Sequence, residues 1–208
     1  RFHEKGFDCY LVGGGVRDLI LGHDIYDFDF TTNARPEQVM RLFRRVVPTG
    51  IKHGTVTVLV DDMEFEVTTY RADGNYTDGR RPETVSYSDS LEEDVKRRDF
   101  TINGLAYDIL TDEIIDLTGG MADIEKKIIR TIGDPLERFG EDGLRTYRAC
   151  RFAAKLGFTI DRPTLEAIGD ALGTASKVSA ERIRDEIMKL MDTESPSTGL
   201  EYMRDSGL

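Results

Sequence analysis

Cysteine, long apolar runs and positive charge are all scarce in this sequence, and each shortage argues against a class of protein. The two cysteines among 208 residues, Cys9 and Cys150, lie far apart and outside any metal-ligand spacing. This argues against a cysteine-bound metal and favours buried thiols in a reducing, cytoplasmic compartment, although one disulfide between them stays open. The histidines add little: His3 and His23 carry no signal, and His53 is as compatible with a structural role as with a functional one.

No apolar run approaches the roughly 20 residues of a membrane-spanning helix, and the N-terminus lacks a signal-peptide segment, so we expect no membrane association. The net charge of −11 argues against binding nucleic acid through overall charge. Such binding must use segments outside this chain or local arginine-rich patches: Arg44-Arg45, Arg80-Arg81, Arg97-Arg98 and the set Arg145, Arg148 and Arg151. Because the chain begins without Met and ends soon after a helical segment, we expect a fragment of a longer protein.

The sequence pattern changes near residue 133. Residues 1–132 alternate strand-like and helical segments, which predicts an α/β domain with a small mixed β-sheet. After the break at Gly133-Asp134-Pro135 the periodicity is helical, so 133–208 is predicted to be an all-α second domain. Strands are expected at 7–13, 27–32, 55–60, 64–70 and 113–116, helices at 15–21, 36–43, 141–156, 163–173, 179–192 and 196–204, and a long polar loop at 71–90.

Two aspartates alternate with phenylalanines in Asp27-Phe28-Asp29-Phe30-Thr31-Thr32. Alternate side chains of a strand share a face, so Asp27 and Asp29 are predicted to project together from the polar face. Their repulsion is tolerable where a divalent cation lies between them. On the strand around Val67, either Glu64 or Glu66 could complete the site. Asp-x-Asp alone is a weak signal, since a solvated strand edge has the same pattern.

An apolar strand runs into glycines and then a helix in Leu11-Val12-Gly13-Gly14-Gly15-Val16-Arg17-Asp18. Glycines at a helix start let backbone N–H groups approach an anion, and the helix dipole favours negative charge there. Arg17 could bind phosphate with its planar guanidinium, or form a surface ion pair with Asp18 or Asp24. A phosphate-binding turn and an acidic strand together predict metal-assisted phosphoryl transfer.

Glu141-Asp142-Gly143-Leu144-Arg145 contains a candidate base-reading pair. At about 100° per helical residue, Asp142 and Arg145 lie about 60° apart and can face one ligand. An Asp accepts a hydrogen bond from an exocyclic amino group, and an Arg donates to a ring nitrogen or carbonyl. Cytosine and adenine offer that combination, whereas uracil and guanine do not. The pair can thus select CTP and ATP, although an ordinary ion pair on a helix surface has the same spacing.

These motifs, with Arg97-Arg98-Asp99-Phe100-Thr101-Ile102-Asn103-Gly104 between them, resemble the class II CCA-adding tRNA nucleotidyltransferases and bacterial poly(A) polymerases of the polymerase-β-like superfamily. The resemblance covers most of the chain, with the motifs in order. It implies a catalytic nucleotidyltransferase head domain at 1–132 and a helical, nucleotide-selecting neck domain at 133–208. The body and tail domains of the family are absent from this chain.

The resemblance also implies roles for single residues. Asp27 and Asp29 would be ligands of Mg²⁺, with Glu66 as the third catalytic acid. The predicted nucleotide-binding residues are Gly14, Gly15 and Arg17 for the triphosphate, Arg98, Asp99 and Asn103 for sugar and phosphates, and Glu141, Asp142, Arg145 and Arg148 for the base. The stretch Glu181-Arg182-Ile183-Arg184-Asp185-Glu186 resembles a motif that braces the neck and is assigned no catalysis.

Two further segments bear on the branch of the family. Gly50-Ile51-Lys52-His53-Gly54-Thr55-Val56-Thr57-Val58 is similar to the CCA-adding branch, and the loop from Tyr70 to Pro82 resembles the one associated with adding the final A. We therefore predict a cytoplasmic enzyme that adds C and A to the 3′ end of tRNA from CTP and ATP, without a nucleic-acid template. The alternatives are an A-adding enzyme or poly(A) polymerase and, less favoured because both aspartates are present, a non-catalytic nucleotide-binding regulator.

Overall fold

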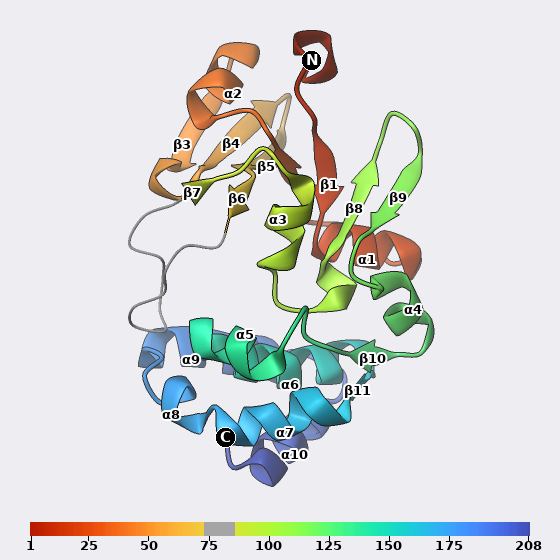
Figure 1. Ribbon diagram of the computed structural model, residues 1–208, viewed down its shortest axis with the longest axis vertical. Coiled ribbons are helices and arrows are strands. Elements are labelled where there is room, and N and C mark those ends of the chain that lie inside the picture. The colour runs from red at the N-terminus through yellow and green to blue at the C-terminus, as the bar shows by residue number, and fades with distance from the viewer. Residues whose placement is uncertain (73–85) are drawn as a thin grey trace. The chain divides into compact units, whose positions relative to one another are not determined.

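The computed structural model describes residues 1–72 and 86–208, which separate into two compact units. The first unit comprises residues 1–72, 86–98 and 102–120, and the second comprises 99–101 and 121–208. A mixed β-sheet with helices forms the first unit and helices dominate the second (Figure 1), so the predicted fold class is confirmed. The contacts group 121–132 with the helical unit, while the functional boundary at residue 133 stays a prediction.

The first unit is built on a seven-stranded sheet in the order β3-β4-β5-β2-β1-β8-β9. Its strands are β1 (Tyr10–Val12), β2 (Asp29–Thr32), β3 (Val46–Gly50), β4 (Thr55–Val60), β5 (Met63–Thr69), β8 (Leu105–Asp108) and β9 (Glu113–Asp116). The unit also contains α1 (Gly14–Ile20), α2 (Pro36–Leu42), α3 (Leu91–Lys96) and a short ladder of β6 (Arg71–Ala72) with β7 (Ser86–Tyr87). Strand β2 is parallel to β5 and antiparallel to β1, which makes the sheet mixed.

The two faces of the β3-β4-β5-β2 half of this sheet differ in character. On one face Val56, Val58 and Val67 belong to the core cluster that also contains Val39 of α2. Because side chains alternate along a strand, the neighbouring positions point to the other face, which carries acidic and hydroxyl side chains. The apolar face thus anchors the sheet and leaves its polar face for chemistry.

The second unit packs α6 (Leu144–Leu156) against α9 (Ala180–Met191) and α10 (Pro196–Ser206). A Cβ added at Gly199 of α10 would lie 2.5 Å from the Leu190 side chain and 2.9 Å from the Cys150 carbonyl oxygen, so glycine permits the close approach of these helices. The unit also contains α4 (Gly120–Glu125), α5 (Pro135–Glu141), α7 (Arg162–Asp170), α8 (Leu172–Ala175) and a parallel ladder of β10 (Ile128–Ile129) with β11 (Thr159–Ile160).

Several predicted boundaries are wrong for local reasons. The strand predicted at 27–32 begins at Asp29, and the single helix predicted at 141–156 is two helices, because the backbone of Asp142 is extended (φ −148°) and ends α5. Residues 91–96, for which no element was predicted, form α3, whose first turn is capped by Ser90. Within the residues that the structure describes, no helix combines the length and hydropathy needed to cross a bilayer.

Candidate active site and family

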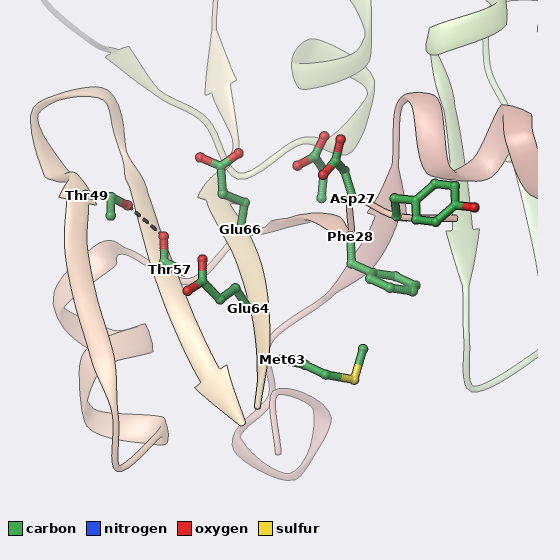
Figure 2. A pocket seen from close by; sticks show the side chains of 9 residues that line it. Asp27, Phe28, Thr49, Thr57, Met63, Glu64 and Glu66 are labelled. Carbon is green, nitrogen blue, oxygen red and sulfur yellow. Dashed lines mark hydrogen bonds between the residues drawn. The ribbon is translucent and has the colours of Figure 1, made fainter. Parts of the chain in front are cut away.

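Three polar residues form a row across the open face of the sheet. The strand register places Asp29 of β2 opposite Glu66 of β5, and Glu66 opposite Thr57 of β4. Figure 2 shows Glu66 and Asp27 pointing to the same side, whereas Phe28 points away. Acidic side chains from two parallel strands, which are distant in sequence, therefore meet on one surface.

Both carboxyl groups of this row, Asp29 and Glu66, have a raised pKa, which is typical of carboxylates without a neutralising cation. Burial raises the pKa of Asp29, the negative charge of Asp27 raises it further, and the Arg98 guanidinium opposes the rise. Burial also raises the pKa of Glu66, as do the charge of Asp29 and a hydrogen bond between the two carboxyl groups. Two carboxyl groups that share a hydrogen bond in this way are a suitable pair of oxygen donors for a divalent cation.

The donor set fits an open site for a divalent cation better than an enclosed one. In residues 1–72 and 86–208 no group of three or more His, Cys, Asp or Glu side chains is arranged to enclose a metal ion. Mg²⁺ needs no such cage, because it is typically held by one or two carboxylates together with water and substrate phosphates. Asp27 and Asp29 thus fit as an open site, with Glu66 beside them.

The predicted phosphate-binding turn lies next to two guanidinium groups. A Cβ added at Gly13, where φ is +72°, would lie 3.3 Å from Nη1 of Arg98, and one added at Gly14 would lie 3.3 Å from Nη2 of Arg17. The Nε atom of Arg98 is buried and has no hydrogen-bond partner among the described residues. A buried N–H donor beside a glycine turn is suited to an anionic oxygen.

Gly15 has a packing role that the motif alone does not reveal. A Cβ at this position would lie 3.3 Å from the backbone carbonyl oxygen of Asp27. The absence of a side chain thus lets the start of α1 approach the segment that leads into β2. Its predicted contact with the triphosphate stays a prediction.

Arg17 is buried rather than exposed, and it bonds to Asn103, another residue predicted to bind the nucleotide. Its Nε donates to Oδ1 of Asp18 over 2.8 Å, and its Nη1 donates to Oδ1 of Asn103 over 2.7 Å. The predicted ion pair with Asp18 is therefore present, but inside the protein. The hydrogen bond between Arg17 and Asn103 fixes both side chains. Their binding of phosphate and sugar stays a prediction.

Asp94 organises this region and was missed by the sequence analysis. Its side chain is fully buried, and Oδ1 accepts hydrogen bonds from Nε and Nη2 of Arg97 over 2.9 and 2.7 Å. Its Oδ2 accepts from Oγ1 of Thr31, over 3.1 Å, and from Nη2 of Arg98, over 3.2 Å. Asp94 thus ties Arg98 to β2, two residues from Asp29. The sequence assigned it no role, because it lies within a run of charged residues.

In the helical unit, Asp142 and Arg145 do not share a helix face as predicted. Asp142 lies between α5 and α6, where Oδ1 accepts from Nη1 of Arg182 over 3.2 Å and Oδ2 accepts from Nη2 over 2.8 Å. Arg145 donates instead to Oε2 of Glu141 over 2.5 Å. The predicted shared face is wrong, because Asp142 follows the end of α5 and Arg145 lies in α6, so the two residues are not on one continuous helix. Arg182, assigned only a bracing role by sequence, holds the predicted base-reading carboxylate.

The other predicted nucleotide-binding residues of this unit form a second network. Arg148 donates from Nε to Oδ2 of Asp99 over 2.8 Å, and its Nη1 lies 3.8 Å from Oε1 of Glu186. Glu186 is buried and also pairs with Arg151 over 2.5 Å. Burial lowers the pKa of Arg148, but the charges of Asp99 and Glu186 outweigh it and raise the pKa overall. Arg148 is therefore held as a permanent cation.

The described residues bring the predicted site together in two sets. Asp27, Asp29, Glu66, Gly14, Gly15, Arg17, Arg98 and Asn103 belong to the first unit, and Asp99, Glu141, Asp142, Arg145 and Arg148 belong to the second. The loop predicted between Tyr70 and Pro82 lies largely outside the described residues. Sequence reasoning also missed the hydroxyl pair of Thr49 and Thr57, whose only signal was their β-strand alternation.

Two family models match this chain. The one described as "Poly A polymerase head domain" matches residues 9–130, and the one described as "Probable RNA and SrmB-binding site of polymerase A" matches residues 157–208. A CCA-adding enzyme of Lactobacillus johnsonii is 45% identical over 206 residues, covering 99% of this chain and 52% of that protein. The chain thus spans about half the length of the curated relatives it matches.

Solved structures of the same family also match this chain. The crystal structure of the Bacillus stearothermophilus CCA-adding enzyme in complex with CTP matches with a TM-score of 0.92 and 41% identity, covering 100% of this chain and 50% of that one. A tRNA nucleotidyltransferase complexed with a primer tRNA and an incoming ATP analog matches with a TM-score of 0.82 and 33% identity, covering 99% of this chain and 59% of that one. Because the head-domain model matches more than half of its residues, the chain belongs to the Poly A polymerase head domain family, that of the CCA-adding tRNA nucleotidyltransferases and bacterial poly(A) polymerases.

Proposed function

We propose that this protein is a metal-dependent nucleotidyltransferase that adds C and A to the 3′ end of tRNA, using CTP and ATP and no nucleic-acid template. The observation that carries the proposal is the Asp29–Glu66 carboxylate pair beside the glycine turn and Arg98. Relatives solved with CTP, and with a primer tRNA and an ATP analog, support these substrates.

Asp27 and Asp29 would hold Mg²⁺, with Glu66 as the third acidic residue. Divalent metals are general in this family, and the bound ion would lower the pKa of the attacking 3′-hydroxyl and neutralise phosphate charge. Arg98 and the turn at Gly13 to Gly15 would bind the triphosphate and stabilise the leaving pyrophosphate. The hydroxyl oxygen forms a bond to the α-phosphorus as the bond from that phosphorus to pyrophosphate breaks.

Base selection would fall to the helical unit. Asp142 would accept a hydrogen bond from the exocyclic amino group of cytosine or adenine, and Arg145 would donate to the adjacent ring acceptor. Glu141 would orient Arg145, while Arg148, held by Asp99, would contribute a fixed positive charge. A base with a carbonyl and a ring N–H in these places leaves both side chains mismatched, which disfavours UTP and GTP.

A cytoplasmic location is compatible with the thiols. Cys9 and Cys150 are both free, and burial raises the pKa of each to about 12. Thiols of this kind are suited to a reducing compartment, where they serve as small apolar residues.

The test is to incubate the full-length protein with tRNA lacking its CCA end, Mg²⁺ and each nucleoside triphosphate separately. We expect incorporation of C from CTP alone, then A once C has been added, and none from UTP or GTP. The name of the matching family also suggests a poly(A) or A-adding enzyme. That alternative predicts A incorporation from ATP with no use of CTP, and such a result would overturn the CCA-adding proposal.

A further inference from the structure

Four arginine-rich places in the sequence were candidates for contact with nucleic acid, and most of them are accounted for inside the protein. Five of these arginines each pair with a carboxylate of the chain: Arg97, Arg98, Arg145, Arg148 and Arg151. Residues 80–81 lie outside the described part of the chain. Arg44 and Arg45 remain. Neither they nor their neighbour Arg41 forms an ion pair with any residue that the structure describes, and all three are exposed.

These three arginines lie within five residues of the chain, at the edge of the first unit. Arg41 is in the last turn of α2, and Arg44 and Arg45 lie between that helix and β3, the edge strand of the sheet (Figure 1). Arg1 joins them, because its Nη1 donates to the carbonyl oxygen of Leu42 over 3.1 Å. We call Arg1, Arg41, Arg44 and Arg45 the arginine patch.

The charge around the patch is opposite to that of the whole chain. Residues 34–60, which contain α2, β3 and β4, have four arginines, one lysine and a single acidic residue, Glu37, and therefore a net charge of +4. The chain as a whole has a net charge of −11. Because an acidic protein repels the phosphates of RNA, binding an RNA requires a local surface of positive charge.

A purely structural role explains only part of the patch. The helix dipole stabilises a cation in the last turn of a helix, which accounts for Arg41. Arg1 satisfies a carbonyl at the end of the same helix. Arg44 and Arg45 follow the helix end and have neither role. The backbone of Arg45 is nevertheless fixed, because its carbonyl oxygen accepts a hydrogen bond from the N–H of Leu59 over 3.0 Å.

Resting on the function proposed above, we propose that the arginine patch binds backbone phosphates of the acceptor strand of tRNA. The planar guanidinium group, with its several N–H donors, suits a phosphate. Neighbouring strands lie about 4.8 Å apart, so β3, three strands from β2, is about 14 Å from Asp29. No patch residue lines the cavity of about 700 Å³ at Asp27, Asp29 and Glu66. The patch therefore contacts phosphates upstream of the reacting nucleotide.

The test is the salt dependence of tRNA binding to the full-length protein, measured without nucleotide. Each phosphate contact releases counterions, so loss of one contact lowers the slope of log Kd against log salt concentration by about 1. Arg44→Gln combined with Arg45→Gln should therefore lower the slope by about 2. The same variant should raise Kd for tRNA lacking CCA about 10-fold at about 0.1 M salt. KM for CTP and kcat at saturating tRNA should stay unchanged, because the patch lies outside the nucleotide site.

Two matched variants separate local charge from side-chain shape and from net charge. Arg44→Lys combined with Arg45→Lys keeps both charges and should retain the wild-type slope, with Kd raised no more than about 3-fold, because lysine binds phosphate as a point charge. Arg162→Gln combined with Arg204→Gln removes the same charge from exposed arginines that already pair with carboxylates, and should leave the slope unchanged. An equal fall in slope in this last variant would overturn the proposal, because net charge would then set the binding.

Phosphate ethylation locates the contact on the RNA. Ethylation removes the charge of one phosphate, so ethyl groups on the acceptor strand should weaken binding to the wild-type protein and have no further effect on the Arg44→Gln, Arg45→Gln variant. Interference confined to other parts of the tRNA, or an unchanged slope in that variant, would overturn the proposal, whether the patch binds an acidic protein instead or only solvent.

The binding measurement also separates this proposal from the function on which it rests. A wild-type protein that binds tRNA through the patch but transfers no nucleotide would overturn the proposed function and leave the patch in place. A protein that transfers C and A, with the same KM for tRNA in the wild type and in the Arg44→Gln, Arg45→Gln variant, would overturn the patch alone.

Discussion

The carboxylates of the predicted site are in opposite electrostatic states in the two units. In the first unit, Asp29 and Glu66 face each other. Burial and then the charge of Asp27 raise the pKa of Asp29, against the opposing Arg98, and burial and the charge of Asp29 raise the pKa of Glu66. In the helical unit, each predicted carboxylate already has a cationic side chain as partner, as in the pairing of Asp142 with Arg182. The Asp29–Glu66 pair lacks a neutralising positive charge, which a bound cation can supply. The carboxylates of the helical unit are already neutralised by arginine side chains.

The difference suggests two ways of preparing a site. Repulsion between neighbouring carboxylates destabilises the folded protein until a cation binds between them, so such a group favours metal binding. Paired carboxylates and guanidinium groups hold each other in one orientation, so they can present fixed donors and acceptors to a base. Catalysis would depend on a metal ion that binds to the first unit. Selection of the base would depend on side chains that ion pairs already hold in place in the second unit.

The largest effect is expected at the carboxylate pair. Asp29→Asn should lower kcat for nucleotide addition about 10³-fold, because an amide cannot supply the negative charge that holds a divalent cation. Incorporation of radiolabelled CTP into tRNA lacking CCA measures it. Asp62→Asn, an exposed aspartate on the turn between β4 and β5, is the control and should retain full activity. Equal activities of the Asp29→Asn and Asp62→Asn variants would show that the carboxylate pair of the first unit does not hold a catalytic cation.

A second large effect is expected where the first unit does contain a paired carboxylate. Asp94→Ala should lower the free energy of unfolding by about 3 kcal/mol, because it leaves Arg97 and Arg98 without their buried acceptor. Urea unfolding measures the change. Glu92→Ala in the same helix breaks the exposed pair with Lys96 and should leave the free energy of unfolding nearly unchanged, because water screens that pair. Similar losses in both variants would show that burial of Asp94 adds nothing.

Sequence reasoning succeeded where the signal is local. The alternation of β4 and β5 predicted both strands within a residue or so, because each strand has one apolar face on the core. It failed where a partner is distant in the chain. Arg17 bonds to Asn103, and Asp142 bonds to Arg182, which lies 40 residues further on. Periodicity reports which face a residue occupies and carries no information about which element covers it.

The same limit explains the error at Asp142 and the omission of Asp94. Helical periodicity continues across 141–156, but Gly143 is packed so closely that an added Cβ would lie 2.6 Å from the Thr174 carbonyl oxygen. That tertiary contact accompanies the break between α5 and α6. Asp94 lies in a run of charged residues, and only the fold reveals the donors from four residues, Thr31, Arg71, Arg97 and Arg98, that justify its burial.

A smaller effect is expected from loosening the helical unit. Arg182→Leu removes both donors to Asp142 and should raise KM for CTP and ATP about 10-fold, the cost of losing a charged hydrogen-bonded pair that orients the carboxylate. Discrimination against UTP should fall with it. Arg184→Leu is the control, since its pair with Asp185 on the same helix is exposed. Indistinguishable KM values in the two variants would show that Arg182 does not orient Asp142.

The smallest effect concerns acid pH. Burial raises the pKa of Asp94, but the charges of Arg97 and Arg98 outweigh it and hold the pKa below its ordinary value. On acidification the unfolded chain therefore takes up this proton first, at a pKa near 3.9, so the contribution of Asp94 to stability is complete above that pH and is lost as pH falls through the folded pKa.

Unfolding free energies between pH 7 and pH 3 test this assignment, with Asp94→Asn as the comparison because asparagine keeps the shape and does not titrate. The wild-type protein should lose its advantage over the variant below about pH 4, at a rate of no more than about 1.4 kcal/mol per pH unit for one proton. A constant difference across the range would mean that Asp94 stabilises the first unit through hydrogen bonds alone. In that case its charge would contribute nothing to holding Arg98 beside the glycine turn.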